Sequence, residues 1–341
     1  MDQIININRQ NDDVLYYVDN KEKLLYAMIS PILFGLLNGL KNEVIEDYKG
    51  MNKISLQQLA RSYKKGDGDY GVCFEYAVHS AIRNKNSLVI ERIQSALSMC
   101  GIEGKNTTSI LLGFEKSKII QRINNKLLST LTENSILISS PCGERIKIKK
   151  YLQSILSSFR RKEVRDQLPE SINEIWKVDL FIGNIDTDMW AAVSVKSNPR
   201  ELKCAKGLAI GIIPSSWFGN QSCQINKTKD MIICPLLSDY NFMSLFNSAW
   251  QIVQNFIQSD AKIPHESLIH DGSEMRIYNR LEKNRDVPVL ELVDDDLKQL
   301  AQPDFISTKI ITPYMDNNLS DKEDANRTIF VPNAFYGKKS L

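Results

Sequence analysis

The sequence lacks the residue patterns that mark zinc sites, serine hydrolases and phosphate-binding loops. Its six cysteines are scattered without a CxxC pair, and none stands at ligand spacing from one of the three histidines. No G-x-S-x-G sequence occurs, and the C-terminal GKKSL lacks the glycine pattern of a Walker A loop. These absences argue against a zinc site and a nucleophilic triad, and the scattered cysteines are typical of reduced thiols.

A strong net charge and a long hydrophobic run are also missing. The net charge is only +2, so any signal for nucleic acid must be local. The N-terminus has no basic segment followed by an apolar one, and therefore predicts no secretory signal. The apolar run 24–40 is at the lower limit for a membrane span and contains Pro31, Gly35 and Gly39. We interpret it as a buried helix pair of a cytoplasmic protein without a membrane partner.

The pattern of apolar residues along the chain changes after Pro169. Before it, apolar periodicity favours helices, with one short strand expected in 135–141. After it, short segments rich in Val, Ile and aromatic residues alternate with polar turns and indicate buried strands. The expected helices are 14–48, broken near Pro31 and Gly39, then 55–65 with Ser55 as a cap, 70–85, 87–101, 117–132, 148–166 and 241–260. The expected later strands are 176–182, 190–196, 207–214 and 230–237.

This order of elements predicts an α/β fold with a mixed central sheet flanked by helices, plus an N-terminal helical region. We expect that helical region to span 1–65 and the core to span 66–260. From 285 onward the chain becomes more acidic and less regular, and we expect residues 261–341 to form a peripheral lobe and tail.

The segment 177–198 predicts a central hairpin that carries charge among apolar residues. With a turn at 183–188, Asp179 lies opposite Ala192, one step from Ser194, and near Lys196. A buried, unpaired aspartate and lysine would cost several kcal/mol. The two side chains therefore either form a structural ion pair or line a wet cleft that binds a metal.

Asp179 followed by Ser194-Val195-Lys196 resembles the motif of the PD-(D/E)xK nuclease superfamily, which includes restriction endonucleases and phage-defence nucleases. Upstream, Gly71 to Glu75 is similar to the G-x-x-x-E helix of its resolvase-like members. The resemblance covers about residues 70–260 and implies a restriction-endonuclease-like core. It implies Mg²⁺, with Mn²⁺ as a substitute, held by Asp179, Glu75 and the Val195 carbonyl.

Within that resemblance, Lys196 orients the attacking water and Ser194 is a minor contact. The sequence departs from the motif because Ser194 stands where the family has an acid, and Val178 stands where it has proline. A glutamate from elsewhere must then complete the site, with Glu75 as the first candidate and Glu201 as the next. If neither reaches it, the domain is a silent nuclease fold.

Three other polar residues have simpler interpretations. Asp186 and Asp188 fall in the expected turn, where aspartate is favoured for its backbone geometry. His79 follows Glu75 by one helical turn, and we interpret it as a satisfied helix histidine.

A local basic stretch precedes the hairpin. Residues 145–165 carry eight Lys or Arg and one Glu, and a second basic cluster follows Lys196. Such clusters neutralise phosphates, although a solvated helix face has the same composition. The candidate nucleic-acid contacts are Lys147, Lys149, Lys150, Arg160, Arg161, Arg200 and Lys203.

The resulting prediction is a Mg²⁺-dependent endonuclease that cuts DNA, acts as a homodimer or defence-complex subunit, and serves restriction or antiviral defence. Catalysis is assigned to Glu75, Asp179, Ser194 and Lys196. The alternative is a catalytically silent subunit that binds nucleic acid or protein. An RNA-cleaving toxin of the same fold is a weaker rival, since the sequence does not separate DNA from RNA.

Overall fold

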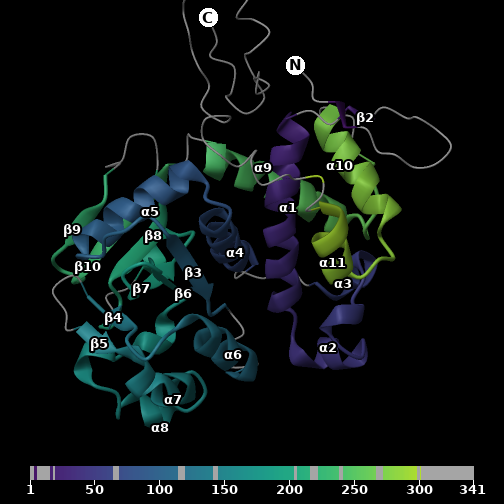
Figure 1. The fold of residues 1–341 in the computed structure, drawn as a ribbon. Coiled ribbons are helices and arrows are strands. Elements are labelled where there is room, and N and C mark those ends of the chain that lie inside the picture. The colour runs from purple at the N-terminus through teal and green to yellow at the C-terminus, as the bar shows by residue number, and fades with distance from the viewer. Residues whose placement is uncertain are drawn as a thin grey trace, which may run out of the picture. The chain divides into compact units, whose positions relative to one another are not determined.

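The expected mixed α/β fold is confirmed by a computed structural model, in which helices flank an eight-stranded mixed sheet (Figure 1). The structure describes residues 4–5, 16–17, 20–63, 69–113, 120–140, 145–202, 206–215, 222–237, 241–265, 272–297 and 300.

The central sheet has the strand order β3-β6-β7-β8-β10-β9. Its strands β3, β6 and β7 are antiparallel neighbours, whereas β7, β8 and β10 run parallel and β9 closes the edge antiparallel to β10. The short strand β4 pairs with the first half of β7 and with β5. The bounds are β3 Thr107–Leu111, β4 Ile136–Ile138, β5 Arg145–Lys147, β6 Leu180–Asn184, β7 Met189–Val195, β8 Ile210–Ser215, β9 Gln224–Asn226 and β10 Met231–Leu237.

The strand expected at 176–182 begins later than predicted. Residues Ile175–Lys177 form a short 3₁₀ helix, η4, and the strand β6 starts only at Leu180. Glu174 precedes η4 in the left-handed region at φ 70°, which turns the chain before the strand. Consequently Asp179 lies in the two-residue link between η4 and β6, at the entrance of the hairpin.

Helices cover both faces of this sheet. Helix α4 packs against β3 and β7, and α5 packs against β10. On the other side, Leu127 of α6 and Leu152 of α7 belong to one buried cluster with Phe181 and Trp190 of the hairpin. The helices are α4 Asp69–Arg83, α5 Ser87–Met99, α6 Ile120–Thr130, α7 Ile148–Ser158 and α8 Lys162–Arg165, with 3₁₀ turns η3 Glu170–Ile172 and η5 Pro199–Glu201.

The predicted break at Pro31 is wrong, because α1 runs unbroken from Asn20 to Gly39. A proline inside a helix removes one hydrogen bond and costs about 3 kcal/mol. Nearly every apolar side chain of the run is buried, including Ile29, Ile32 and Leu33, and this burial offsets the loss. The helix ends at Gly39 as expected, and a separate helix α2, Asn42–Asp47, follows.

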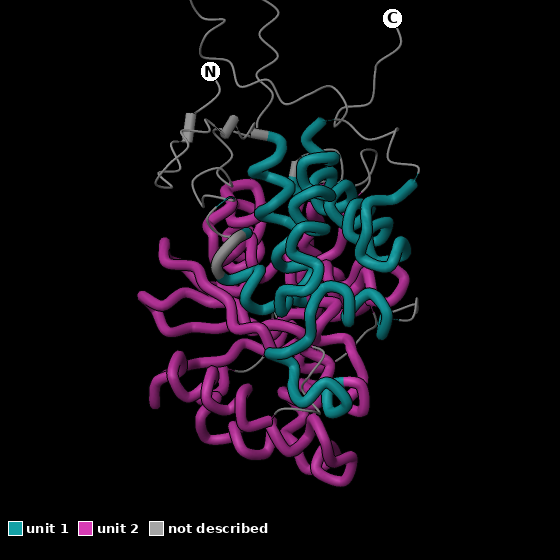
Figure 2. Tube along the Cα trace, turned by 90° about the vertical axis from the view of Figure 1, so that its right-hand side faces the viewer, with its two compact units in different colours: residues 1–34, 45–64, 239–341 teal, residues 35–44, 65–238 magenta. Residues whose placement is uncertain are grey.

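Two compact units divide the chain (Figure 2). Unit 2 comprises 35–44 and 65–238 and holds the whole eight-stranded sheet. Unit 1 comprises 1–34, 45–64 and 239–341. The domain ranges predicted from composition stay a prediction, and the expected tail at 301–341 lies outside the described residues.

Unit 1 is mainly helical. Helix α3 packs against α9, and α10 packs against α9. Ser55 caps α3 as expected, because its hydroxyl accepts from the Gln58 N–H while the Gln58 side chain accepts from the Ser55 N–H. Its elements outside α1 and α2 are β1 Ile4–Ile5, β2 Tyr16–Tyr17, η1 Met51–Lys53, α3 Leu56–Ser62, α9 Asn241–Gln258, α10 Gly272–Lys283, α11 Val289–Glu291 and a π-helical turn Leu292–Leu297.

Within the described residues, no helix combines the length and apolar character that a membrane crossing requires.

Candidate active site

The β6–β7 hairpin is present, but its register differs from the prediction by two residues. Leu180 pairs with Val193 and Asn184 with Met189, so the turn occupies only 185–188. The expected pairing of Asp179 with Ala192 is therefore wrong. Because the turn is shorter than the predicted one, the pairing partner of Asp179 lies two residues farther along β7. Asp179 lies beside Val193 and Ser194.

The backbone of Asp179 is fixed from both sides. Its N–H donates to the Val193 carbonyl at 2.9 Å, and its carbonyl accepts from the Leu112 N–H at 3.0 Å. Its side chain is buried at 5% exposure, and a single oxygen, Oδ2, accepts three hydrogen bonds. The donors are Ser194 Oγ at 3.1 Å, the Val195 N–H at 2.9 Å and Lys196 Nζ at 3.0 Å. Asp179 is thus held by every residue of the Ser-Val-Lys triplet.

Glu75 reaches the same cluster from α4. The apolar positions of this helix, such as Phe74 and Val78, are buried, and Glu75 is buried with them at 7% exposure. The first turn of α4 comes close to the end of β7: a Cβ added at Gly71 would lie 3.5 Å from Ser197 Oγ. That distance is an ordinary van der Waals contact, so the spacing at Gly71 does not require a glycine.

Lys196 joins the two carboxylates. Its Nζ lies 3.0 Å from Asp179 Oδ2 and 3.5 Å from Glu75 Oε1, and its side chain keeps 28% exposure. Burial alone would lower the pKa of Lys196, but the charges and hydrogen bonds of the two carboxylates outweigh it and raise the pKa above its ordinary value. The predicted proximity of Asp179, Glu75 and Lys196 is confirmed, and the amine is a cation at neutral pH.

The arrangement offers oxygen donors of the kind that hard divalent cations bind, namely two carboxylates and a hydroxyl. Across the described residues, no three His, Cys, Asp or Glu side chains converge as a metal cluster would. Glu201, the reserve candidate, lies exposed on η5, where it accepts from Asn198 Nδ2 at 3.4 Å. A cation held here would have Asp179 and Glu75 as its carboxylate ligands.

The Val195 amide is a contact that the sequence analysis missed. Val195 was expected to contribute its carbonyl to a metal, and that role stays a prediction. The structure adds the N–H of the same residue, which donates to Asp179. Because every residue except proline has a main-chain N–H, the residue type does not reveal this donor. Only the register of the hairpin could have predicted the contact.

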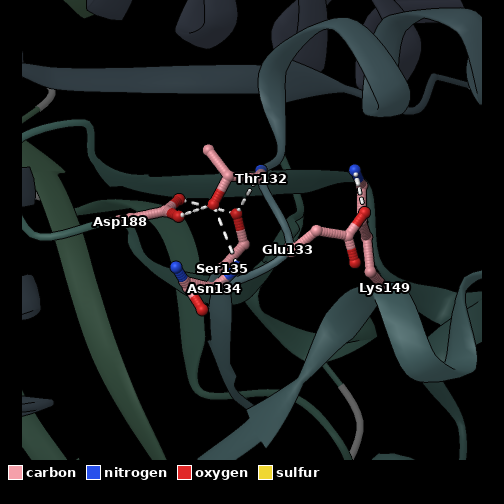
Figure 3. Close-up of polar contacts among 6 residues, drawn as sticks. All are labelled: Thr132, Glu133, Asn134, Ser135, Lys149 and Asp188. Carbon is pink, nitrogen blue, oxygen red and sulfur yellow. Dashed lines mark hydrogen bonds and ion pairs between the residues drawn. The ribbon is translucent and has the colours of Figure 1, made fainter.

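The turn of the hairpin forms a second polar cluster around Asp188 (Figure 3). Its carboxylate accepts from Thr132 Oγ1 and Ser135 Oγ, both at 2.6 Å, and from Trp190 Nε1 at 3.0 Å. Burial opposes ionisation, but these hydrogen bonds lower the pKa of Asp188 below its ordinary value. Asp188 adopts a positive φ of 49°, and its carbonyl accepts from the Ile136 N–H. It ties β4 to the hairpin, in line with its interpretation as a turn residue.

Asp186 and His79 also have structural partners. Asp186 accepts from Asn106 Nδ2 at 2.6 Å on the exposed side of the turn. His79 Nδ1 lies 2.8 Å from Ser109 Oγ on β3. Burial, followed by the charges of Arg83 and Lys126, lowers the pKa of His79 to about 3, so the ring is neutral at physiological pH.

The expected nucleic-acid contacts have different surroundings. Lys149 forms an ion pair with Glu133 at 2.8 Å (Figure 3), and Lys203 lies outside the described residues. Arg200 is exposed on η5, four residues beyond Lys196. The remaining four are exposed: Lys147, Lys150, Arg160 and Arg161.

The basic stretch is anchored next to the entrance of the hairpin. Helix α7 packs against η4, which ends two residues before Asp179. The Arg165 guanidinium carbon of α8 lies 4.9 Å from the centre of the Trp176 ring of η4, a cation–π contact that joins the two elements. The basic segment is therefore attached to the turn that leads into Asp179.

Comparisons with known proteins found no match for this chain among family models, curated proteins or solved structures.

Proposed function

We propose that unit 2 is a metal-dependent nuclease of the PD-(D/E)xK type that hydrolyses phosphodiester bonds in DNA. The observation that carries the proposal is the meeting of Glu75 of α4 with Asp179, just before β6, and Lys196, just after β7. A lone ion pair would need only one carboxylate. Placing a second buried carboxylate on the same amine is costly unless the site has a use for the extra charge.

The order of elements also supports the proposal. A helix carrying a glutamate, α4, precedes β3 and the β6–β7 hairpin, and a parallel strand, β8, follows. The described part of the connection between β7 and β8 contains the three-residue turn η5.

Each residue of the cluster would have its own role in the hydrolysis. Asp179 and Glu75 present the carboxylate oxygens that would hold a divalent cation, which when bound would polarise the phosphate and lower the pKa of a water. Lys196 stays protonated, so it donates to the attacking water or to the phosphate oxygens, where negative charge develops. Ser194 and the Val195 N–H hold Asp179 in one orientation.

DNA would be held by the exposed basic residues of unit 2. Lys147, Lys150, Arg160 and Arg161 are exposed in the stretch 145–165, and Arg200 follows the catalytic strand. These side chains would neutralise phosphates without reading the sequence of bases, so that binding weakens steeply with salt. A cytoplasmic homodimer or defence-complex subunit, acting in restriction or antiviral defence, completes the proposal.

A second candidate function is a silent nuclease fold that binds nucleic acid or protein. The observation in its favour is that Lys196 already pairs with both carboxylates, while Ser194 replaces the acid that would bring a third. In this case the cluster is a buried ion-pair network that holds α4 to the hairpin.

Cleavage of supercoiled plasmid separates the two functions. The purified protein is incubated with Mg²⁺, Mn²⁺ or EDTA, beside Lys196→Ala and the matched surface variant Lys177→Ala. Lys177 is a suitable control because it lies near Asp179 in the chain but pairs with Glu174 on η4. The nuclease proposal expects metal-dependent nicking or linearisation that Lys196→Ala abolishes and Lys177→Ala retains.

Calorimetry with Mg²⁺ extends this test to the case in which cutting requires a partner. Binding of Mg²⁺ that disappears in Asp179→Asn supports the nuclease even without cleavage. Neither cleavage nor Mg²⁺ binding, together with retained DNA binding, would favour the silent fold.

A further inference from the structure

Two cysteines that are distant from the candidate active site lie opposite each other in the sheet. The register between β9 and β10 pairs Asn226 with Met231, Ile225 with Ile232, and Gln224 with Ile233. The next pair in this antiparallel series is Cys223 with Cys234. Directly opposed residues have Cα atoms about 4.5–5.5 Å apart, which lies within the roughly 4.4–6.8 Å that a disulfide spans.

The side chains of this pair converge on one atom. Cys223 Sγ lies 3.4 Å and Cys234 Sγ 3.6 Å from the carbonyl oxygen of Arg92. Arg92 belongs to α5, which packs against β10 and therefore sets both thiols on the same side of the strand pair. Both cysteines are free thiols in this structure.

The two thiols differ in the way a reactive pair requires. Cys223 is half-buried, whereas Cys234 is completely buried. A hydrogen bond from Cys234 lowers the pKa of Cys223 to about 7 against the effect of burial, with help from Ser95 and the charge of Arg92. The hydrogen bond to Cys223 and burial raise the pKa of Cys234 well above its ordinary value. Cys223 is therefore the nucleophile, and Cys234 the resolving thiol.

We propose that Cys223 and Cys234 are a redox modification site, which a hydroperoxide such as hydrogen peroxide converts into an intramolecular disulfide. The Cys223 thiolate attacks one peroxide oxygen, the O–O bond breaks, and Cys223 sulfenic acid and hydroxide form. Cys234 then attacks the Cys223 sulfur, the S–O bond breaks, and the proton of the Cys234 thiol leaves with the hydroxyl group as water. The two thiols lose two electrons to one peroxide, and a dithiol reductant returns them by exchange.

Other described cysteines are less suited to this chemistry. Cys73 and Cys100 are buried, and burial raises the pKa of Cys100 to about 12 and that of Cys73 well above its ordinary value. Cys142 and Cys204 lie outside the described residues. The experiment must therefore locate the bond rather than count lost thiols.

The disulfide would lock the edge of the sheet. It would link β9 to β10 at the residue that pairs with Ile212 of β8, and Ile212 in turn pairs with Val195 of the active-site strand. The proposal does not depend on the nuclease function, since it rests on the cysteines, α5 and the strand register alone.

Peptide mapping of the oxidised full chain tests the proposal. The protein is treated with hydrogen peroxide, free thiols are blocked with N-ethylmaleimide, and the peptides are analysed by mass spectrometry without reduction. The expected product is one linked peptide that joins Cys223 to Cys234 and that dithiothreitol separates. Peroxide-treated protein in which both thiols remain open to the blocking reagent, or in which Cys223 is linked elsewhere, would overturn the proposal.

Two variants show whether Cys223 reacts first. In Cys234→Ala the sulfenic acid cannot be resolved, so dimedone should label Cys223, whereas Cys223→Ala should leave Cys234 unlabelled. The matched control Cys100→Ser should form the linked peptide as the parent does. Circular dichroism before treatment establishes that each variant is folded. Dimedone labelling of Cys234 in folded Cys223→Ala would contradict the assigned roles.

Discussion

Two aspartates stand at opposite ends of the same hairpin, and their partners differ in kind. Asp188, at the turn, accepts hydrogen bonds from two hydroxyls and an indole, all of them neutral groups. Asp179, at the entrance, accepts from a hydroxyl, an amide and the ammonium group of Lys196, which a second carboxylate also contacts. Neutral donors are sufficient to hold the partly buried carboxylate of Asp188 in place.

The difference indicates which end of the hairpin carries function. Three neutral hydrogen bonds satisfy Asp188 and fix the 132–135 turn to the sheet. At Asp179 a hydroxyl and an amide already supply such bonds, so Lys196 and Glu75 exceed what structure needs. Perturbed and excess charge in one buried place is typical of functional sites, although structural networks also produce it. Substitutions at either end of the hairpin test this difference.

The largest effect is expected from Glu75→Gln. The amide keeps the size of the side chain and an acceptor for Lys196 but removes the charge that a cation needs. Plasmid cleavage under Mg²⁺ should fall on the order of 100-fold or more. The control Glu201→Gln removes an exposed carboxylate of the same type and should cleave as the parent does. Equal cleavage by Glu75→Gln and the parent would remove Glu75 from the site.

A smaller effect is expected on DNA binding when Arg160 and Arg161 are both changed to Gln. If each neutralises one phosphate, the slope of log affinity against log salt should become shallower by about two. Fluorescence anisotropy with duplex DNA at several salt concentrations measures this slope. Lys49→Gln with Lys53→Gln removes the same charge from unit 1 and should leave the slope unchanged. A shallower slope in this control would mean that only net charge matters.

At the turn, Asp188→Asn should affect stability and not cleavage. The substitution weakens the hydrogen bonds from Thr132 and Ser135, and Asp188 is only partly buried. The free energy of unfolding should therefore fall by about 1 kcal/mol, measured by urea denaturation. Asp186→Asn changes an exposed carboxylate two residues away and should cost less. A larger loss from Asp186→Asn would show that Asp188 does not anchor the turn.

The smallest effect concerns pH and Lys196. The folded state raises the pKa of this lysine, so its contribution to stability is fully present below the ordinary value of 10.5 and is lost as pH rises above it. The difference in unfolding free energy between the parent and Lys196→Met should therefore stay constant below about pH 10 and shrink as the pH rises above 10.5. Lys53→Met, at an exposed position, should show no such change. A difference that grows with pH would contradict the direction of the shift.

The sequence predicted the carboxylate cluster better than the backbone that builds it. Alternation along β7 and the spacing from Asp179 to Lys196 were sufficient to bring these residues together. The turn length was wrong by two residues, and an even error leaves the facing side chains on the same side of the sheet. An error of one residue would have separated Asp179 from Ser194.

Other features could not be read from local patterns. The helix continues through Pro31 because the burial of its apolar side chains outweighs the cost of the hydrogen bond that proline removes. Helix propensity alone does not include this burial. The strand β3 was missed because its residues Thr107 to Leu111 begin with polar side chains. Cys223 and Cys234 lie eleven positions apart without a motif, and only the register of β9 with β10 brings them together.

The most direct test compares the two ends of the hairpin in one assay. Asp179→Asn and Asp188→Asn remove the same charge by the same change, and both proteins are incubated with supercoiled plasmid and Mg²⁺ beside the parent and an EDTA control. The account predicts that the parent and Asp188→Asn cut the plasmid and that folded Asp179→Asn does not. Equal metal-dependent cleavage by both variants would contradict it, because the cluster at Asp179 would then be structural.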